Sequence, residues 1–499
     1  MKKQHEVGFY TRNIVRHGRD LGMFTLGTGL LLCLLFVLGY SYFVTIFMSN
    51  DLILAIAKGG SEKRLLIAAC VLSVPAGGLY WLWRRGQPFS LVPFMVFYLL
   101  FSACVCGAYA WSVDPAYVSD FGRMWQAASR MAETDPLPVK GIIGQRALFV
   151  AYPVVEVFGA SAAAMEFANS TIFMVIGLVG YMAMRTSRSH LPAQAFALSW
   201  LCCFEPVMAI GIPTHDLWGL LFISLGLWVA AELYGAVGDA TTRPWLLALA
   251  APLGALLALA QLQREVGVIF LLATAITLLW VGLHRERKMV SALTLVILFV
   301  FYGISMGLLG VAGAKSPPGQ QSKMNVARLV GFSGSFSTGR FDFGLAMRET
   351  FIDPESVDNT DAALLARSVF LTDSAEHPAR RVSNVVSRLA ALSRPGSQQY
   401  FYISEVPPSR GQVIAVLILL SSLLVFGLGA CSGTYLLSRA KQTIFPVTAT
   451  MVFFSGGMLI VFCTLSELQP RYAFFMWMTA SMLVANGLFE QGRRTGTAS

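Results

Sequence analysis

Long apolar stretches recur along this chain and limit what it can fold into. Twelve segments of about 20 residues carry few charges, and a helix of that length crosses roughly 30 Å of hydrocarbon. A bilayer offers the backbone no water, so each crossing segment must satisfy its own N–H and C=O groups. The sequence therefore predicts an all-α polytopic membrane protein of about twelve transmembrane helices. The predicted spans are 24–48, 65–83, 91–111, 162–184, 193–212, 217–236, 244–261, 267–283, 290–312, 413–437, 445–465 and 472–489.

The composition agrees with a lipid-embedded chain. Of the 499 residues, 56% are hydrophobic and only 13% are charged. Soluble domains carry about 25% charged residues, so a soluble multidomain protein is excluded. The net charge of +10 could suggest a nucleic-acid partner, but the placement of the basic residues argues against one.

Basic residues cluster on alternate connections between the predicted spans. These connections would all lie on one side of the membrane, and by the positive-inside rule that side is the cytoplasm, together with both termini. One connection departs from the pattern, because Lys58, Lys63 and Arg64 would lie outside. The basic residues that follow the pattern are Lys2, Lys3, Arg12, Arg16, Arg19, Arg84, Arg85, Arg185, Arg188, Arg243, Arg285, Arg287, Lys288, Arg439, Lys441, Arg493 and Arg494.

Two connections are much longer than the others, and both fall on the external side. Long connections in a compact protein are usually functional or disordered, and helical patterning in these two favours a function. The chain therefore divides into a two-span N-terminal part (1–90), a transmembrane core (91–313) with an external loop (112–161), an external helical cap (314–412), and C-terminal helices with a cytoplasmic tail (413–499).

The first external segment contains an amphipathic helical pattern. Ser119 or Asp120 is a plausible N-cap for this helix. Its apolar stripe is predicted to lie along the membrane surface, with aromatic side chains at the depth of the headgroups. The stripe consists of Phe121, Met124, Trp125, Ala128 and Met131.

Ionisable groups at the external ends of the spans are candidates for chemistry, because charge is costly near hydrocarbon. Asp114 and Asp120 could cap a helix or act as a general base on an acceptor hydroxyl, and the local sequence leaves both interpretations open. Arg471 precedes the last span and could bind phosphate, whereas Tyr472 is explained equally well by interfacial partitioning.

Three further groups stand beside or inside spans. His215 and Asp216 occupy a short external turn, where they could cap the next helix or line a cavity. Arg264 and Glu265 occupy another such turn, where an arginine could meet a phosphate. Glu205 precedes a proline within the fifth predicted span, and it must be protonated, paired or in contact with water.

The order of these features resembles the large bacterial branch of the GT-C glycosyltransferases, which includes the dolichyl-phosphate-mannose protein mannosyltransferases and the aminoarabinose transferases of lipid A. The resemblance covers about residues 91–490. It rests on short motifs in a fixed order on one membrane side. These are Ser119–Phe121, Arg146 with Tyr152–Pro153, Phe158–Ser161, Phe167–Ser170, Pro206, Asp216, Arg264–Glu265 and Gln469–Tyr472.

The resemblance implies one active site on the periplasmic face of the bacterial inner membrane. It implies a polyprenyl-phosphate sugar donor held among the helices, and a glycan, lipid or protein acceptor. No cofactor is certain, and a divalent metal stays open: acidic residues and one histidine near the external face could hold one, but no ligand spacing demands it. By position, Asp120 or Asp114 would be the catalytic base. Arg471, Arg264 and Tyr472 would bind the donor phosphate, with His215, Asp216, Glu265 and Arg146 as further cavity residues.

Two other classes of function fit part of the pattern. O-antigen polymerases and ligases also combine about a dozen spans with a large late external loop, but they lack the early aspartate loop. A secondary transporter suits the number of spans and Glu205. However, transporters place their ionisable groups near the midplane, usually within two matching halves.

Overall fold

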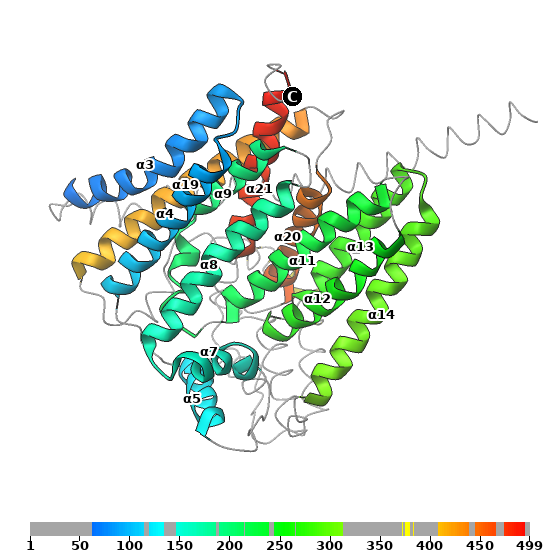
Figure 1. The fold of residues 1–499 in the computed structure, drawn as a ribbon, viewed down its shortest axis with the longest axis horizontal. Coiled ribbons are helices and arrows are strands. Elements are labelled where there is room, and N and C mark those ends of the chain that lie inside the picture. Colours follow the sequence, from blue (N-terminus) through cyan, green and yellow to red (C-terminus); the bar gives the residue numbers. More distant parts are fainter. Residues whose placement is uncertain are drawn as a thin grey trace, which may run out of the picture.

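The computed structural model shows an all-helical protein (Figure 1). It describes residues 62–113, 119–133, 146–185, 189–213, 215–238, 244–264, 266–312, 408–438, 445–465 and 474–494, with a few residues between 372 and 383. These parts contain helices and turns and no strand. The helices are α3 (Glu62–Arg85), α4 (Leu91–Ser112), α5 (Ser119–Glu133), α7 (Ala151–Phe158), α8 (Ala162–Arg185), α9 (His190–Leu201), α10 (Phe204–Val207), α11 (His215–Gly238), η1 (Pro244–Leu249), α12 (Ala250–Arg264), α13 (Gly267–His284), α14 (Lys288–Ala312), α19 (Pro408–Ser438), α20 (Pro446–Leu465) and α21 (Phe474–Arg494).

Seven of these helices are long and apolar enough to cross a membrane, namely α3, α4, α8, α11, α13, α14 and α19. Shorter apolar helical stretches lie in α12, α20 and α21. The chain is therefore a multi-pass membrane protein, although the predicted count of twelve spans is not reached by these criteria. The first predicted span, 24–48, lies outside the described residues, as does nearly all of the predicted cap 314–412.

Burial separates central helices from peripheral ones. More than half of the apolar window is buried in α8 and α11, whereas only 11% is buried in α14. The outer face of α14 exposes Leu293, Val296, Val300 and Ile304, each at least half exposed. Such a surface suits lipid and would be costly in water, so α14 lies at the rim of the bundle.

The fifth predicted span, 193–212, is wrong as a single helix. Helix α9 ends at Leu201, and its last turn tightens as the Cys202 and Cys203 amides donate to the carbonyls of Ser199 and Trp200. Pro206 lacks the N–H that would bond to the carbonyl four residues earlier, and its ring crowds that carbonyl, so a straight helix cannot continue through it. The chain instead forms the single-turn α10 and a series of turns to residue 213.

Contacts between polar side chains show which helix ends lie together. Tyr234, late in α11, hydrogen-bonds Thr450, early in α20, with 2.7 Å between the hydroxyl oxygens. The Phe445 amide donates to Asn486 Oδ1, late in α21, over 2.9 Å. The C-terminal ends of α11 and α21 therefore both lie near the start of α20. Figure 1 shows the C-terminal ends of α8 and α13 on this same side, away from α5 and α7.

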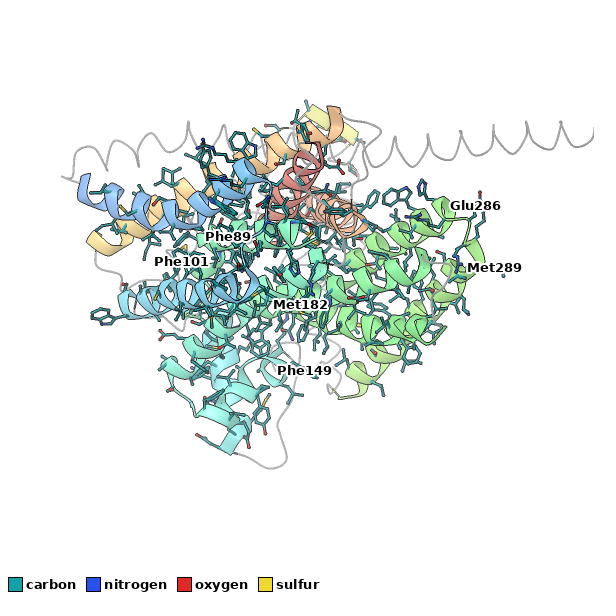
Figure 2. The ribbon with its side chains drawn as sticks, turned by 45° about the horizontal axis from the view of Figure 1, so that its top comes forward. Phe89, Phe101, Phe149, Met182, Glu286 and Met289 are labelled. Atoms are coloured by element: carbon teal, nitrogen blue, oxygen red, sulfur yellow. The ribbon has the colours of Figure 1, made fainter. Side chains whose placement is uncertain are left out.

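The side opposite α5 and α7 carries basic residues at the ends of α3 and α8 and around the turn from α13 to α14. We call it the basic end, and we call the opposite side the α5 end. Figure 2 shows Glu286 and Met289 at the turn from α13 to α14, which belongs to the basic end. The basic end is defined by Arg84, Arg85, Arg185, Arg285, Arg287 and Lys288.

Candidate functional site

The turns between α10 and α11 form the best-fixed irregular segment at the α5 end. Asn169, fully buried in α8, donates its side-chain amide to the carbonyl oxygens of Ile210 at 2.9 Å and Ile212 at 2.8 Å. Tyr109 of α4 donates its hydroxyl to the Met208 carbonyl over 3.1 Å. Buried carbonyls without a partner are costly, so these bonds set the course of the chain before α11 begins.

His215 and Asp216 follow this segment directly and are the first two residues of α11. Both side chains are buried. A carboxylate in the first turn of a helix is favoured by the unpaired N–H groups there, which agrees with the capping interpretation of Asp216. Trp218, one residue after Leu217, donates its indole N–H to Asn169 Oδ1 over 3.2 Å, so Asn169 fixes both the turn and the start of α11.

Arg146 joins the first external segment to the end of α12. Its side chain is half-buried, and Nε donates to the carbonyl oxygen of Leu262 over 3.3 Å. The last carbonyls of a helix lack intrahelical donors, and an arginine is well suited to satisfy one of them. The contact brings Arg146 to the same helix end as Arg264, the last residue of α12.

Helices α5 and α7 pack together on the start of α8 to form a small core of their own. Met124, Ala128 and Met131 of α5 are buried against residues of α7 and α8 that include Val154 and Met165. The predicted helix in the first external segment is therefore confirmed. Its predicted position along the membrane surface is wrong for these three residues, because their apolar stripe is used to pack on the protein itself.

Glu205 lies in α10 and is 95% buried. Its Oε2 accepts a hydrogen bond from the indole Nε1 of Trp477 over 3.0 Å, and its Oε1 has no hydrogen-bond partner among the described residues. Trp477 stands in the first turn of α21, the helix that begins three residues after Arg471. This hydrogen bond joins α10, which follows the break after α9, to α21, the helix that follows the Arg471–Tyr472 motif.

Several predicted site residues cannot be placed in full. Asp120 is the second residue of α5 and Arg264 is the last of α12, but their side chains lie outside the described part of the chain. Asp114, Glu265, Arg471 and Tyr472 lie outside it altogether. The predicted pairing of Asp120 with Arg471 therefore stays a prediction.

A metal site was left open by the sequence. Within the described residues, no group of three or more His, Cys, Asp or Glu side chains is placed to hold a metal ion. The acidic candidates Asp114 and Glu265 are not among those residues.

Two buried amides at the α5 end were not identified as important from the sequence. Asn169 belongs to one of the family motifs, but its role in holding the 208–213 turns depends on contacts 40 or more residues away. Gln263 is fully buried beside Arg264. The signal available in the sequence was the presence of a carboxamide inside or next to an apolar span, where an unpaired polar group is costly.

No known family model matches the chain, and no curated protein matches it. Solved structures do align with it. The oligosaccharyltransferase of Archaeoglobus fulgidus, in complex with zinc and sulfate, aligns with 81% of this chain at 12% identity and a TM-score of 0.44. A second structure of that enzyme, tethered to an acceptor peptide, aligns with 86% of this chain at 12% identity and a TM-score of 0.40. The chain spans about half of that enzyme, 53% and 50% in the two structures.

A third similar structure is ArnT from Cupriavidus metallidurans bound to undecaprenyl phosphate. It aligns with 82% of this chain and 78% of its own at 15% identity, with a TM-score of 0.37. At these identities and scores the similarity concerns the course of the chain and assigns no residue.

Proposed function

We propose that this chain is a GT-C-type membrane glycosyltransferase that moves a sugar from a polyprenyl-phosphate donor to a hydroxyl group of a glycan, lipid or protein acceptor. One observation supports the proposal: α5 and α7 lie beside the start of α11, where Trp218 packs on their core, and Arg146 bonds to the end of α12. Asp120 begins α5, Arg146 contacts the end of α12, and His215 begins α11. Arg264 ends α12, and α21 begins three residues after Arg471.

The basic end supports an orientation in the membrane. Arg185 ends α8, Arg285 follows α13, and Lys288 begins α14, all on the side opposite α5. The positive-inside rule assigns such a side to the cytoplasm. The α5 end would then face the periplasm of a bacterial inner membrane, and both termini would be cytoplasmic.

The proposed chemistry is displacement at the anomeric carbon of the donor sugar. Asp120, or alternatively Asp114, takes the proton of the acceptor hydroxyl as its oxygen bonds to that carbon. The bond from the same carbon to the phosphate oxygen breaks, and the lipid phosphate leaves with the bonding electrons. Arg471, with Arg264 and Tyr472, stabilises the negative charge that grows on this leaving group.

The test is sugar transfer by the purified protein in liposomes. Lipids that carry a labelled sugar on a single polyprenyl phosphate are supplied with bacterial envelope extract as the acceptor source. Asp120→Asn and Asp114→Asn are compared, and the variant that removes the base is expected to lose about 10²- to 10⁴-fold in rate. Glu156→Gln is the matched control, because Glu156 is an exposed carboxylate of α7 at the same end.

A second pair of variants addresses the leaving group. Arg471→Lys keeps the charge but loses the planar two-pronged donor, and a loss of about 10²-fold is expected. Arg285→Lys at the basic end is the control and should retain the wild-type rate. Full activity of both aspartate variants would refute the assigned base. Turnover of diphosphate-linked glycans alone would favour the polymerase or ligase class.

A further inference from the structure

Gln263 lies in the last turn of α12, and its side chain is fully buried. Within the described part of the chain, neither its Oε1 nor its Nε2 has a hydrogen-bond partner. A carboxamide offers two N–H donors and an oxygen with two acceptor positions. Buried polar side chains are nearly always paired, so one that is unpaired at both atoms needs an explanation such as a ligand.

A second buried glutamine shows how this protein treats an amide that belongs to the fold. Gln194 of α9 is also fully buried, and both of its polar atoms are used. Its Oε1 accepts from the Phe89 amide over 2.7 Å, and its Nε2 donates to the Phe89 carbonyl over 2.9 Å. Figure 2 labels Phe89 at the end of the α3–α4 connection. The two glutamines are therefore equally buried, but only Gln194 has hydrogen-bond partners for both of its side-chain polar atoms.

The groups that flank Gln263 in the sequence are paired with other residues. The carbonyl of the preceding Leu262 is held by Arg146. The turn to α13 is closed by the Val268 amide, which donates to Gln261 Oε1 over 3.0 Å. Gln261 and Gln263 lie about 200° apart around α12. Gln261 therefore faces the turn to α13 and accepts its hydrogen bond, whereas Gln263 faces another side of the helix.

The α12–α13 turn is also tightly packed. A Cβ at Gly267 would lie 2.0 Å from the Leu257 carbonyl oxygen and 2.8 Å from the Gln261 amide nitrogen. The two helices thus touch through backbone atoms at this position. The end of α12 that carries Gln263 is therefore held by close packing and by hydrogen bonds, which is what a residue that orients a ligand requires.

We propose that Gln263 binds two neighbouring hydroxyl groups of the donor sugar, one through Nε2 and one through Oε1. The inference rests on the proposed function and adds a feature of the substrate to it. A phosphate offers acceptors only and would leave Oε1 unpaired, whereas a hydroxyl both donates and accepts. Gln263 directly precedes Arg264, a proposed phosphate ligand, and the sugar is bonded to that phosphate.

The experiment compares Gln263→Leu with Gln194→Leu in the full-length protein in detergent. Leucine has a similar volume and no polar atoms. Removing an unpaired buried amide should leave the melting temperature equal to or above that of the wild type, whereas removing the paired amide of Gln194 should lower it by several degrees. An equal fall in both variants would show that Gln263 serves the fold, and would overturn the proposal.

The second measurement separates sugar from phosphate. Gln263→Leu should lower kcat/KM for the lipid-linked sugar about 10- to 100-fold and leave the Kd for sugar-free polyprenyl phosphate unchanged. Donors that lack one hydroxyl of the pair should be poor for the wild type and equal to the parent donor for the variant. An equal loss of affinity for sugar-free polyprenyl phosphate would instead indicate a phosphate ligand and would overturn the sugar assignment.

The failure of this inference is distinct from the failure of the proposed function. A wild-type protein that turns over no lipid-linked sugar refutes the glycosyltransferase, and this inference with it. An active wild-type protein whose Gln263→Leu variant has an unchanged kcat/KM for every donor refutes only the role of Gln263.

Discussion

Asn169 offers the sharpest test of how the α5 end is held together. Its amide nitrogen lies 2.8 Å from the carbonyl oxygen of Ile212, 2.9 Å from that of Ile210 and 3.4 Å from that of Ala209. An NH₂ group has two hydrogens, so two of these are full bonds and the longest is a shared one. The side-chain oxygen accepts from the Trp218 indole.

Asn169→Leu removes all of these bonds from a fully buried position. Two carbonyls and one indole N–H lose a partner, and each unpaired buried group costs about 1–3 kcal/mol. Local relaxation and the apolar gain of leucine offset part of this sum. We expect a net loss of about 3–5 kcal/mol in the free energy of unfolding. In a chain of this size that corresponds to a fall of roughly 3–8 °C in the melting temperature.

Thermal unfolding in detergent, followed by tryptophan fluorescence, measures this effect. Thr171→Val is the control, because Thr171 lies two residues further along α8, where its hydroxyl bonds within the helix to the Phe167 carbonyl in an exposed position. The control should unfold within about 1 °C of the wild type. Trp218→Phe combined with Asn169→Leu should cost less than the sum of the single changes, since both remove one shared bond. An Asn169→Leu variant as stable as the wild type would refute the reasoning.

Three further substitutions test other contacts. Gly267→Ala places a methyl group 2.0 Å from the Leu257 carbonyl oxygen, and we expect a loss of at least about 2–4 kcal/mol, seen as a lower melting temperature. Arg146→Ala leaves a helix-end carbonyl without its charged donor and should cost about 1–3 kcal/mol, with reduced transfer activity. Glu205→Gln keeps an acceptor for the Trp477 indole. The melting temperature should therefore stay close to that of the wild type, and the rate of sugar transfer should stay within about threefold of it.

The glycine and arginine changes each have a matched control, and the glycine and glutamate changes each have an outcome that would contradict the reasoning. Gly303→Ala in α14 meets nothing within 4 Å and should be neutral or slightly stabilising, so equal damage from both glycine changes would count against the packing argument. Arg84→Ala at the basic end should leave transfer unchanged. Loss of all activity in Glu205→Gln would assign Glu205 to the reaction or to transport, contrary to the proposal.

The helical course of the chain was predictable because it depends on local hydrophobicity. Ten of the twelve predicted spans fall on helices of the structure, 193–212 is broken after α9, and 24–48 lies outside the described residues. The error at 193–212 has a local cause that the sequence displayed, since Pro206 stands in the middle of the span. One proline hardly changes a mean hydropathy over 20 residues, but it prevents a straight helix from continuing through its position.

The α5 helix shows the limit of a one-dimensional pattern. Its stripe with Met124, Ala128 and Met131 was recognised as amphipathic, but amphipathicity does not say what covers the apolar face. A membrane surface and a protein surface satisfy it equally well. The structure shows α7 and α8 as the covering elements, and the periodicity of one helix does not encode which other helices pack against it.

Buried amides show why the candidate site could be predicted only in part. Asn169, Gln194 and Gln263 are all carboxamides in apolar helices, and the sequence marks all three as costly. Their partners lie 40 to 105 residues away where they exist, so only the packed structure can separate them. Asn169 and Gln194 are paired and hold turns in place. Gln263 is unpaired within the described part of the chain and stands next to a proposed phosphate ligand. Two of the three buried amides are thus paired by the fold itself. The third, Gln263, would gain its partners only when a ligand binds, as proposed for the donor sugar.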